Sequence, residues 1–129
     1  MKKPIITKGK RKQAIARVAL YPGNGTITIN GQLLRNYSNE SLRLRVSEPL
    51  IIAGNNDVNL TITCRGGGEN GQADAIRLAI ARALVQHDKK LKKVFDEYDR
   101  LLLVADVRQN EACKPNDSKP RDKRQKSYR

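Results

Sequence analysis

This sequence is short of the side chains on which metal sites, disulfide bonds and base-stacking surfaces depend. Its 129 residues include two cysteines, one histidine, one phenylalanine, four tyrosines and no tryptophan. A zinc site needs about four nitrogen or sulfur ligands close together, and Cys64, Cys113 and His87 show no ligand-like spacing. We therefore expect no metal and no other cofactor. The scarcity of aromatic rings argues against stacking on a run of single-stranded bases and favours contacts with phosphates and grooves.

Long apolar segments are absent as well. No run of eighteen apolar residues occurs, and residues 1–20 lack the apolar centre of a signal peptide. Neither end of the chain is apolar or amphipathic enough to enter a membrane surface. We expect a soluble cytoplasmic protein without a membrane partner.

The positive charge is unevenly distributed along the chain. The net charge is +13, and residues 1–17 hold seven Lys or Arg and no acid. Residues 108–129 hold eight Lys or Arg against three acids, whereas the segment between the two ends is nearly neutral. A nearly neutral body with two cationic ends is typical of a protein that packs one small core and binds a polyanion. This pattern predicts a nucleic-acid partner.

The first half of the chain predicts two strands and a helix. Residues 13–21 alternate imperfectly and suit a strand, and residues 26–30 suit a second one. The turn-forming sequence PGNG at 22–25 joins them, so we expect a β-hairpin over 13–30. Residues 40–47 have helical spacing, and we expect Glu48-Pro49 to end that helix.

The second half predicts a strand, two helices and a buried strand. Residues 57–64 alternate cleanly between apolar and polar side chains, and residues 73–87 carry the clearest helical stripe. Residues 89–98 read as a charged helix with Leu91, Val94, Phe95 and Tyr98 facing the core. The apolar run at 101–105 is typical of a central buried strand. Residues 107–129 show no periodicity and are expected to form an extended tail.

The glycine-rich segment at residues 66–72 is the first candidate binding site. It lies between a predicted strand and a predicted helix, where backbone N–H groups and the helix dipole can bind a phosphate. The sequence lacks the Gly-Lys-Ser/Thr of a nucleotide-binding P-loop and the spacing of a dinucleotide site. The alternative is a tight turn that needs positive φ, although three consecutive glycines exceed what one turn requires. The overall charge favours phosphate binding.

No catalytic group of residues is visible, and we expect no enzyme. His87 has no nucleophile partner in the sequence, and the acids near residue 97 alternate with bases as on a solvated surface. One alternative is a subunit of an RNA-processing enzyme, which would need acidic metal ligands near the glycine loop, where only Glu69 and Asp74 occur. Another is a general basic RNA chaperone or membrane-surface binder, which predicts evenly spread charge or an amphipathic arm instead.

Several segments resemble the S-nine family of small-subunit ribosomal proteins. They are GKRKQAIAR at 9–17, PGNG at 22–25, ING at 29–31, EPL at 48–50, GGGENGQA at 66–73, AIR at 75–77, ARAL at 81–84, YDR at 98–100, LVAD at 103–106 and RQKSYR at 124–129. The ending resembles the archaeal and eukaryotic branch, because bacterial members end in Phe-Ser-Lys-Arg. The tail departs from the family pattern, since residues 106–109 read DVRQ where relatives have Asp-Pro-Arg-Arg.

The resemblance implies one α+β domain at 1–106 and an extended basic tail at 107–129. The implied domain has a mixed, mostly antiparallel four-stranded sheet with helices on one face and a left-handed β-α-β crossover. The implied role is that of a structural constituent of the small ribosomal subunit. It would bind rRNA of the subunit head, contact neighbouring ribosomal proteins as a monomer, and extend its tail toward the anticodon stem-loop of the peptidyl-site tRNA.

Charge, the glycine loop and the resemblance together give two sets of candidate residues. The expected rRNA contacts are Lys8, Lys10, Arg11, Lys12, Arg17, Arg65, Gly66, Gly67, Gly68, Gly71, Gln72, Arg77, Arg108, Lys114, Lys119 and Arg121. The expected tRNA contacts are Arg124, Lys126, Ser127, Tyr128 and Arg129. Arginine offers a planar fork suited to phosphate, and Tyr128 offers a ring for a nucleotide or ribose.

Overall fold

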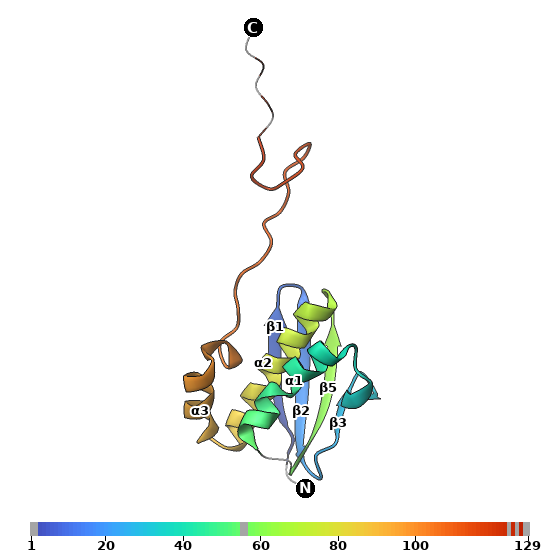
Figure 1. The fold of residues 1–129 in the computed structure, drawn as a ribbon, viewed down its shortest axis with the longest axis vertical. Helices are drawn as coiled ribbons and strands as arrows, with labels where there is room; N and C mark the ends of the chain where they lie inside the picture. The colour runs from blue at the N-terminus through green and yellow to red at the C-terminus, as the bar shows by residue number, and fades with distance from the viewer. Residues whose placement is uncertain (1–2, 55–56, 124, 126, 128–129) are drawn as a thin grey trace.

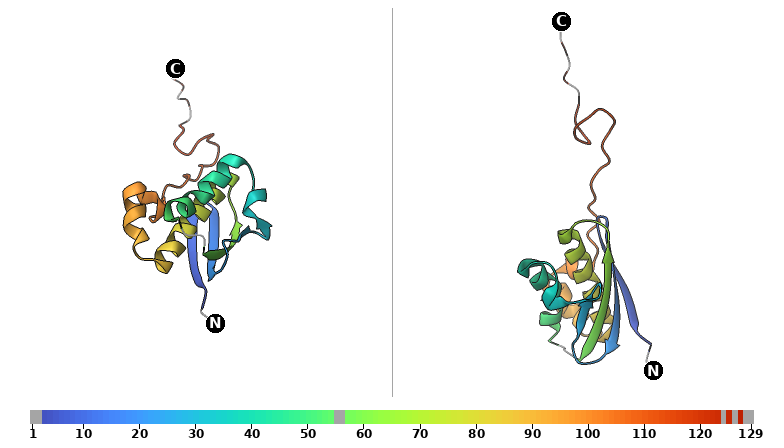
Figure 2. Two further views of the ribbon diagram at one scale, coloured as in Figure 1. Left: turned by 60° about the horizontal axis from the view of Figure 1, so that its bottom comes forward. Right: turned by 90° about the vertical axis from the view of Figure 1, so that its right-hand side faces the viewer.

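A computed structural model describes residues 3–54, 57–123, 125 and 127. In this part of the chain, α-helices cover one face of a five-stranded sheet, and an irregular C-terminal segment leads away from the domain (Figures 1 and 2). The elements in chain order are β1 (Ile5–Arg11), β2 (Ala14–Pro22), β3 (Ile27–Ile29), β4 (Gln32–Leu33), the 3-10 helix η1 (Leu34–Asn36), α1 (Glu40–Ala53), β5 (Val58–Arg65), α2 (Glu69–His87), α3 (Leu91–Tyr98) and the 3-10 helix η2 (Arg100–Leu102). No helix among the described residues is both long and apolar enough to cross a bilayer.

The sheet is mixed and mostly antiparallel, as expected, but its strand order was not predicted. The order is β1-β2-β5-β3-β4, and only the β3–β5 pair is parallel. Between these two parallel strands the chain passes through α1, which makes a β-α-β unit whose hand stays a prediction. The described residues form five strands rather than four. The α+β class and the helices on one face are confirmed (Figure 2).

The predicted hairpin over 13–30 is wrong, because β5 lies between β2 and β3. Asn59 of β5 explains how the connecting turn is held open. Its side-chain oxygen accepts hydrogen bonds from the backbone N–H groups of Asn24, Gly25 and Thr26 at 3.0, 3.1 and 3.0 Å. The turn therefore folds around the end of a third strand instead of closing directly on itself.

Strand β1 was missed, because the basic N-terminal segment was interpreted as an arm outside the core. It pairs antiparallel with β2 along its whole length. Its buried positions include Thr7 and Gly9, which do not give an apolar alternation. The Thr7 hydroxyl donates to the Ala79 carbonyl at 2.7 Å. A Cβ at Gly9 would collide with the Ala75 carbonyl oxygen, so α2 packs directly on the backbone of β1.

The lengths of the helices are set by their buried apolar side chains more than by the proline and glycine residues in their sequences. Helix α1 starts at the cap Asn39, whose side chain accepts from Leu42 N at 3.0 Å, and ends before Gly54 at φ 65°. The predicted end at Glu48-Pro49 is wrong, because Leu42, Val46 and Pro49 form one buried row that continues through the proline. Helix α2 begins inside the glycine-rich segment and buries nine side chains.

The apolar run at 101–105 completes the 3-10 helix η2 and continues as a turn rather than as a strand, so this prediction is wrong. Only Leu102 is buried there, while Leu101 and Val104 are 48% and 43% exposed. The Asp99 side chain accepts from Leu101 N at 3.0 Å, and Arg82 Nε donates to the Leu103 carbonyl at 3.2 Å. Side chains thus bind the backbone groups that a strand would have offered to the sheet.

Helix α3 confirms the prediction of a charged helix at 89–98, but only some of the side chains expected to face the core do so. Phe95 is buried and Leu91 packs against the core, whereas Val94 and Tyr98 are largely exposed. The core lies between the helices and the inner face of the sheet. Among the described residues no side chain after Leu102 is buried, and residues 107–123 form no helix or strand. The domain boundary at residue 106 stays a prediction.

Candidate nucleic-acid interface

The sheet face opposite the helices is uncovered (Figure 2), and its outward positions hold a cluster of cations. We call it the open face; because side chains alternate along a strand, it consists of the positions of β1, β2 and β5 that point away from the core. These are Ile6, Lys8, Lys10, Ile15, Arg17, Ala19, Tyr21, Asn59, Thr61, Thr63 and Arg65. No Asp or Glu is among these described positions. An uncovered surface with four cations and no carboxylate suits a polyanion.

The strand register places these cations in two neighbouring rows. In one row Lys8 lies opposite Arg17, which in turn lies opposite Thr63. In the next row Ile15 lies between Lys10 and Arg65. Like charges directly opposite on a sheet are destabilising. The Lys8 and Arg17 side chains therefore repel each other in the free protein, and a phosphate bound between them would offset that repulsion.

The β1–β2 turn packs against the glycine loop at one end of the open face. Gly66 and Gly67 have φ of 82° and 66°, which side chains rarely adopt. A Cβ at Gly66 would collide with the Gln13 carbonyl, and one at Gly67 would lie 3.0 Å from Ala14 N. Gln72 Nε2 donates to the Gly66 carbonyl at 3.1 Å. Two of the three consecutive glycines therefore have a structural role, as the turn alternative requires.

Gly68 differs from its two neighbours. It has φ −94° and ψ 174°, which any residue adopts, and a Cβ there would have no atom within 4 Å. It caps α2 without a side-chain hydrogen bond, next to a hollow of about 340 Å³ lined partly by Lys12, Asn70 and Gly71. Neither backbone strain nor packing requires a glycine here, although glycine is one of the residues favoured at a helix N-cap. It is the position of the loop where an external phosphate has room to approach.

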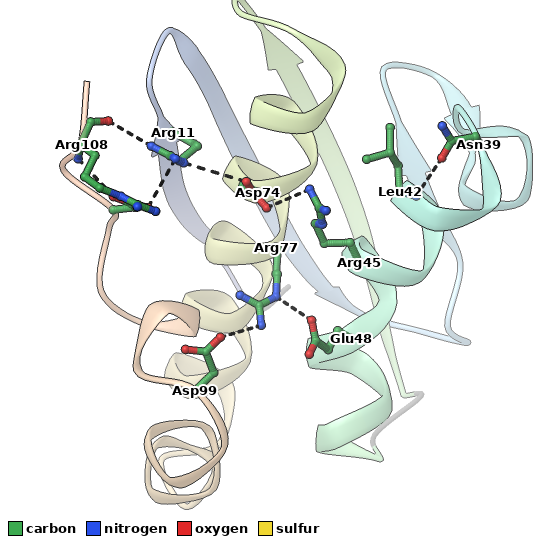
Figure 3. Close-up of polar contacts among 10 residues, drawn as sticks. Arg11, Asn39, Leu42, Arg45, Glu48, Asp74, Arg77, Asp99 and Arg108 are labelled. Carbon is green, nitrogen blue, oxygen red and sulfur yellow. Dashed lines mark hydrogen bonds and ion pairs between the residues drawn. The ribbon is translucent and has the colours of Figure 1, made fainter. Parts of the chain in front are cut away.

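Two of the expected rRNA contacts, Arg11 and Arg77, lie on the helix side and bind carboxylates of the protein itself (Figure 3). The Arg77 side chain is 13% exposed; its Nε donates to Glu48 at 2.8 Å and its Nη2 to Asp99 at 3.2 Å. The Arg11 side chain is 15% exposed and lies 3.5 Å from Asp106 and 3.9 Å from Asp74. This geometry favours a structural role for both arginines.

The start of the C-terminal segment is fixed to the domain by Arg11 and Asp106. Arg11 Nη1 donates to the Arg108 carbonyl at 3.0 Å (Figure 3). Arg108 Nη2 contacts Asp106 at 2.7 Å. The hydrogen bonds from Arg108, with the charges of both arginines, hold the pKa of Asp106 well below its usual range. The Arg108 side chain itself stays 77% exposed. The segment therefore leaves the domain from a defined point beside β1.

Comparison with known proteins identifies the family of the chain. Residues 9–129 match the family model described as Ribosomal protein S9/S16. The chain belongs to this family. It is 46% identical over 129 residues to the small ribosomal subunit protein uS9 of Thermoplasma acidophilum, covering 97% of this chain and 100% of that protein.

Two further archaeal proteins with the same name are similar to the chain. Over 128 residues it is 46% identical to the Halobacterium salinarum protein, with coverage of 95% of this chain and 97% of the relative. Over 129 residues it is 42% identical to the Pyrobaculum aerophilum protein, and the match covers 97% of this chain and 91% of the relative. The resemblance to the S-nine family and its archaeal members is confirmed. As a ribosomal protein the chain is a component of a ribonucleoprotein that acts in translation, and it is not an enzyme.

The structure of this family member brings some candidate residues together and leaves others apart. Lys8, Lys10, Arg17 and Arg65 share the open face, with Lys12 in the adjoining turn. The C-terminal candidates Lys114, Lys119 and Arg121 are exposed, and Arg121 pairs with Glu111 at 2.9 Å. Ser127 is exposed, whereas Arg124, Lys126, Tyr128 and Arg129 lie outside the described residues. The contact of the chain's end with tRNA stays a prediction.

Sequence reasoning missed the polar and apolar residues between the cations. Asn59, Thr61 and Thr63 are the polar positions of the alternating strand, but nothing in the sequence singled them out as part of a binding surface. The omission of β1 concealed the pairing that places Lys8 and Lys10 beside them. Within the described residues no His, Cys, Asp or Glu cluster could hold a metal. Cys64 is buried, and burial raises the pKa of its thiol.

Proposed function

We propose that this protein is a structural constituent of the small ribosomal subunit that binds rRNA of the subunit head through the open face and the adjoining β1–β2 turn. The observation that carries the proposal is the acid-free cluster of Lys8, Lys10, Arg17 and Arg65 on an uncovered sheet. The relatives are named as small ribosomal subunit proteins, which supports rRNA as the polyanion. Phosphate contacts by such cations release counterions and supply most of the affinity.

The C-terminal segment has a separate role in this proposal. It extends toward the anticodon stem-loop of the peptidyl-site tRNA and ends in the candidate residues 124–129. From Arg108 onward it can span at most ~70 Å when fully extended, and residues 107–123 already lead away from the domain (Figure 1). Ordering costs about 1–2 kcal/mol per residue of backbone entropy, so this segment takes a fixed path only when RNA binds it.

Neighbouring ribosomal proteins of the head are the third class of partner, and the protein acts as a monomer among them. On helix α1, Leu44 is 59% exposed and Ile51 is 70% exposed, and both lie away from the open face. Exposed apolar side chains of this kind are consistent with contacts to proteins rather than to phosphates. The ribosome is then the place where the protein works, in the cytoplasm.

The experiment uses small subunits that lack this protein, to which three forms of the chain are added. The open-face variant Lys8→Gln/Arg17→Gln should bind more weakly, and its log K against log salt should be flatter by about 0.7–0.9 for each phosphate that the variant no longer neutralises. The matched control Lys92→Gln/Lys93→Gln removes two exposed cations of α3 and should bind like wild type. Equally weakened binding of both variants would show that net charge alone, and not the open face, carries binding.

The third form lacks residues 124–129. It should join the subunit with wild-type affinity, because the last buried described residue is Leu102. It should release peptidyl-site tRNA several-fold faster, since exposed charge–phosphate contacts contribute ~1 kcal/mol each after screening. Identical tRNA dissociation rates for the full and shortened chains would refute the tRNA role and leave rRNA binding untouched.

A further inference from the structure

The open face is hollowed between its cations. A concave site of about 630 Å³ lies over the ends of β2 and β5 and is lined by Ile15, Arg17, Asn30, Thr63, Arg65 and their neighbours. This volume is within the range of ~300–1,000 Å³ found for small-molecule sites. Most of the lining is carbon, and Arg17 and Arg65 are among the residues that form it. The site thus combines an apolar floor with positive charge.

The rim of the hollow is preformed by an asparagine that extends the sheet. Strand β3 pairs with β5 only as far as Ile62, and Asn30 follows with φ 51°. Its side-chain amide donates to the Cys64 carbonyl at 3.1 Å and accepts from Cys64 N at 2.9 Å. The side chain therefore takes the place of a strand backbone and closes the edge of β5. Both groups of this amide are occupied, which fixes the wall beside Thr63 and Arg65.

The register explains why the floor is apolar. Ile15 lies directly between Lys10 and Arg65, and Thr63 lies opposite Arg17 one row away. A nucleic-acid duplex keeps its bases paired inside and presents phosphates, which would satisfy the cations but leave the apolar floor facing water. An unpaired nucleotide carries both an apolar base face and phosphates. Unpaired bases stack on arginine guanidinium planes as well as on aromatic rings.

We infer that this hollow receives one unpaired nucleotide of the RNA, with its base against Ile15 and its flanking phosphates on Arg17 and Arg65. The inference rests on the proposed rRNA binding and adds the class of RNA structure that the open face recognises. One base in one hollow agrees with the scarcity of aromatic residues, which excludes only a run of stacked bases. The Asn30 amide is held by Cys64, so this wall of the hollow is in place before RNA binds.

The test compares two RNA hairpins that differ at one position. One carries a single bulged 2-aminopurine, a base whose fluorescence rises when it leaves the stack; the other carries the same base paired. The wild-type protein should bind the bulged hairpin at least about fivefold more tightly, equivalent to ~1 kcal/mol of binding free energy. It should also raise the fluorescence of the bulged base and leave that of the paired base unchanged.

Ile15→Ser should remove this preference, whereas Ala19→Ser should keep it. Both residues lie on the open face of β2, but only Ile15 lines the hollow. Urea unfolding checks that both variants are folded. Equal binding of the two hairpins by wild type would overturn the nucleotide site while leaving rRNA binding intact. Absence of binding to either hairpin, even at low salt, would overturn both the site and the proposed function.

Discussion

Arg77→Ala removes the guanidinium that joins three separate parts of the domain. Arg77 projects from α2 and holds Glu48 of α1 on one side and Asp99, which follows α3, on the other (Figure 3). Glu48 also accepts a hydrogen bond from the Tyr98 hydroxyl at 2.6 Å. The substitution therefore separates two carboxylates from their shared cation and leaves their mutual repulsion uncompensated.

The magnitude follows from the exposure of the three groups. Exposed ion pairs contribute about 0–1 kcal/mol each, whereas breaking a buried pair costs about 3–5 kcal/mol. The Arg77 side chain is 13% exposed, but Glu48 and Asp99 are 27% and 38% exposed, so each pair lies nearer the lower figure. We expect a total loss of about 1–3 kcal/mol in the free energy of unfolding. With an m-value of ~1.5 kcal/mol/M this lowers the urea midpoint by about 0.7–2 M.

The assay measures urea unfolding and RNA affinity per folded molecule on the same samples. Arg77→Lys should be intermediate, because a lysine keeps the charge but cannot bind two carboxylates with a planar fork. Arg17→Ala on the open face should behave in the opposite way, with reduced RNA affinity and a change in unfolding free energy below about 0.5 kcal/mol. If Arg77→Ala kept its urea midpoint and lost RNA affinity, Arg77 would be an RNA contact, as its charge alone suggested.

Two further predictions concern the glycine loop and the start of the C-terminal segment. Gly68→Ala should lose at most about 1 kcal/mol, because alanine is less favoured than glycine at an N-cap, and should bind RNA more weakly. Gly67→Ala should lose more stability through its φ of 66° and the crowding at Ala14; unchanged RNA affinity of folded Gly68→Ala would exclude a phosphate at Gly68. The Asp106 carboxyl, followed by NMR, should stay ionised as the pH falls below ~4, because Arg108 lowers its pKa. Its stabilising contact is then complete at neutral pH and lost only as the pH falls through that lowered value. Arg108→Gln should return the titration toward the ordinary range, and titration near pH 4 in wild type would contradict this.

Local pattern was sufficient for the elements whose burial follows a simple period. Strand β5 and helix α2 were predicted close to their observed positions, because Val58 to Cys64 alternate and α2 carries a continuous apolar stripe. Strand β1 was not, because Thr7 and Gly9 occupy its buried side for reasons of hydrogen bonding and close packing with α2. The run at 101–105 was misassigned because an apolar segment of that length does not by itself distinguish a strand from a turn.

The candidate site could be predicted in composition but not in arrangement. Counting charges identified Lys8, Arg17, Arg11 and Arg77 equally, although the first two face solvent and the other two are bound to carboxylates. Which cations remain available depends on contacts between residues far apart in sequence, such as Arg77 with Glu48. The rows on the open face depend in turn on the β1–β2 register. Neither is contained in a one-dimensional pattern.

The position of β5 between β2 and β3 has a consequence for how the chain folds during synthesis. The N-terminal part of the chain can form the β1–β2 and β3–β4 pairs, but the strand that joins them has not yet been made. The two pairs cannot become one sheet until β5 leaves the ribosome, and α2, which covers β1, follows later still. Because long-range pairing of this kind is slow and leaves strand edges and apolar surface exposed, the nascent chain is most vulnerable to misassembly before residue 65 emerges. Substitutions that remove the hydrogen bonds between Asn59 and the 22–26 turn should therefore lower the yield of newly made protein before they affect any other property.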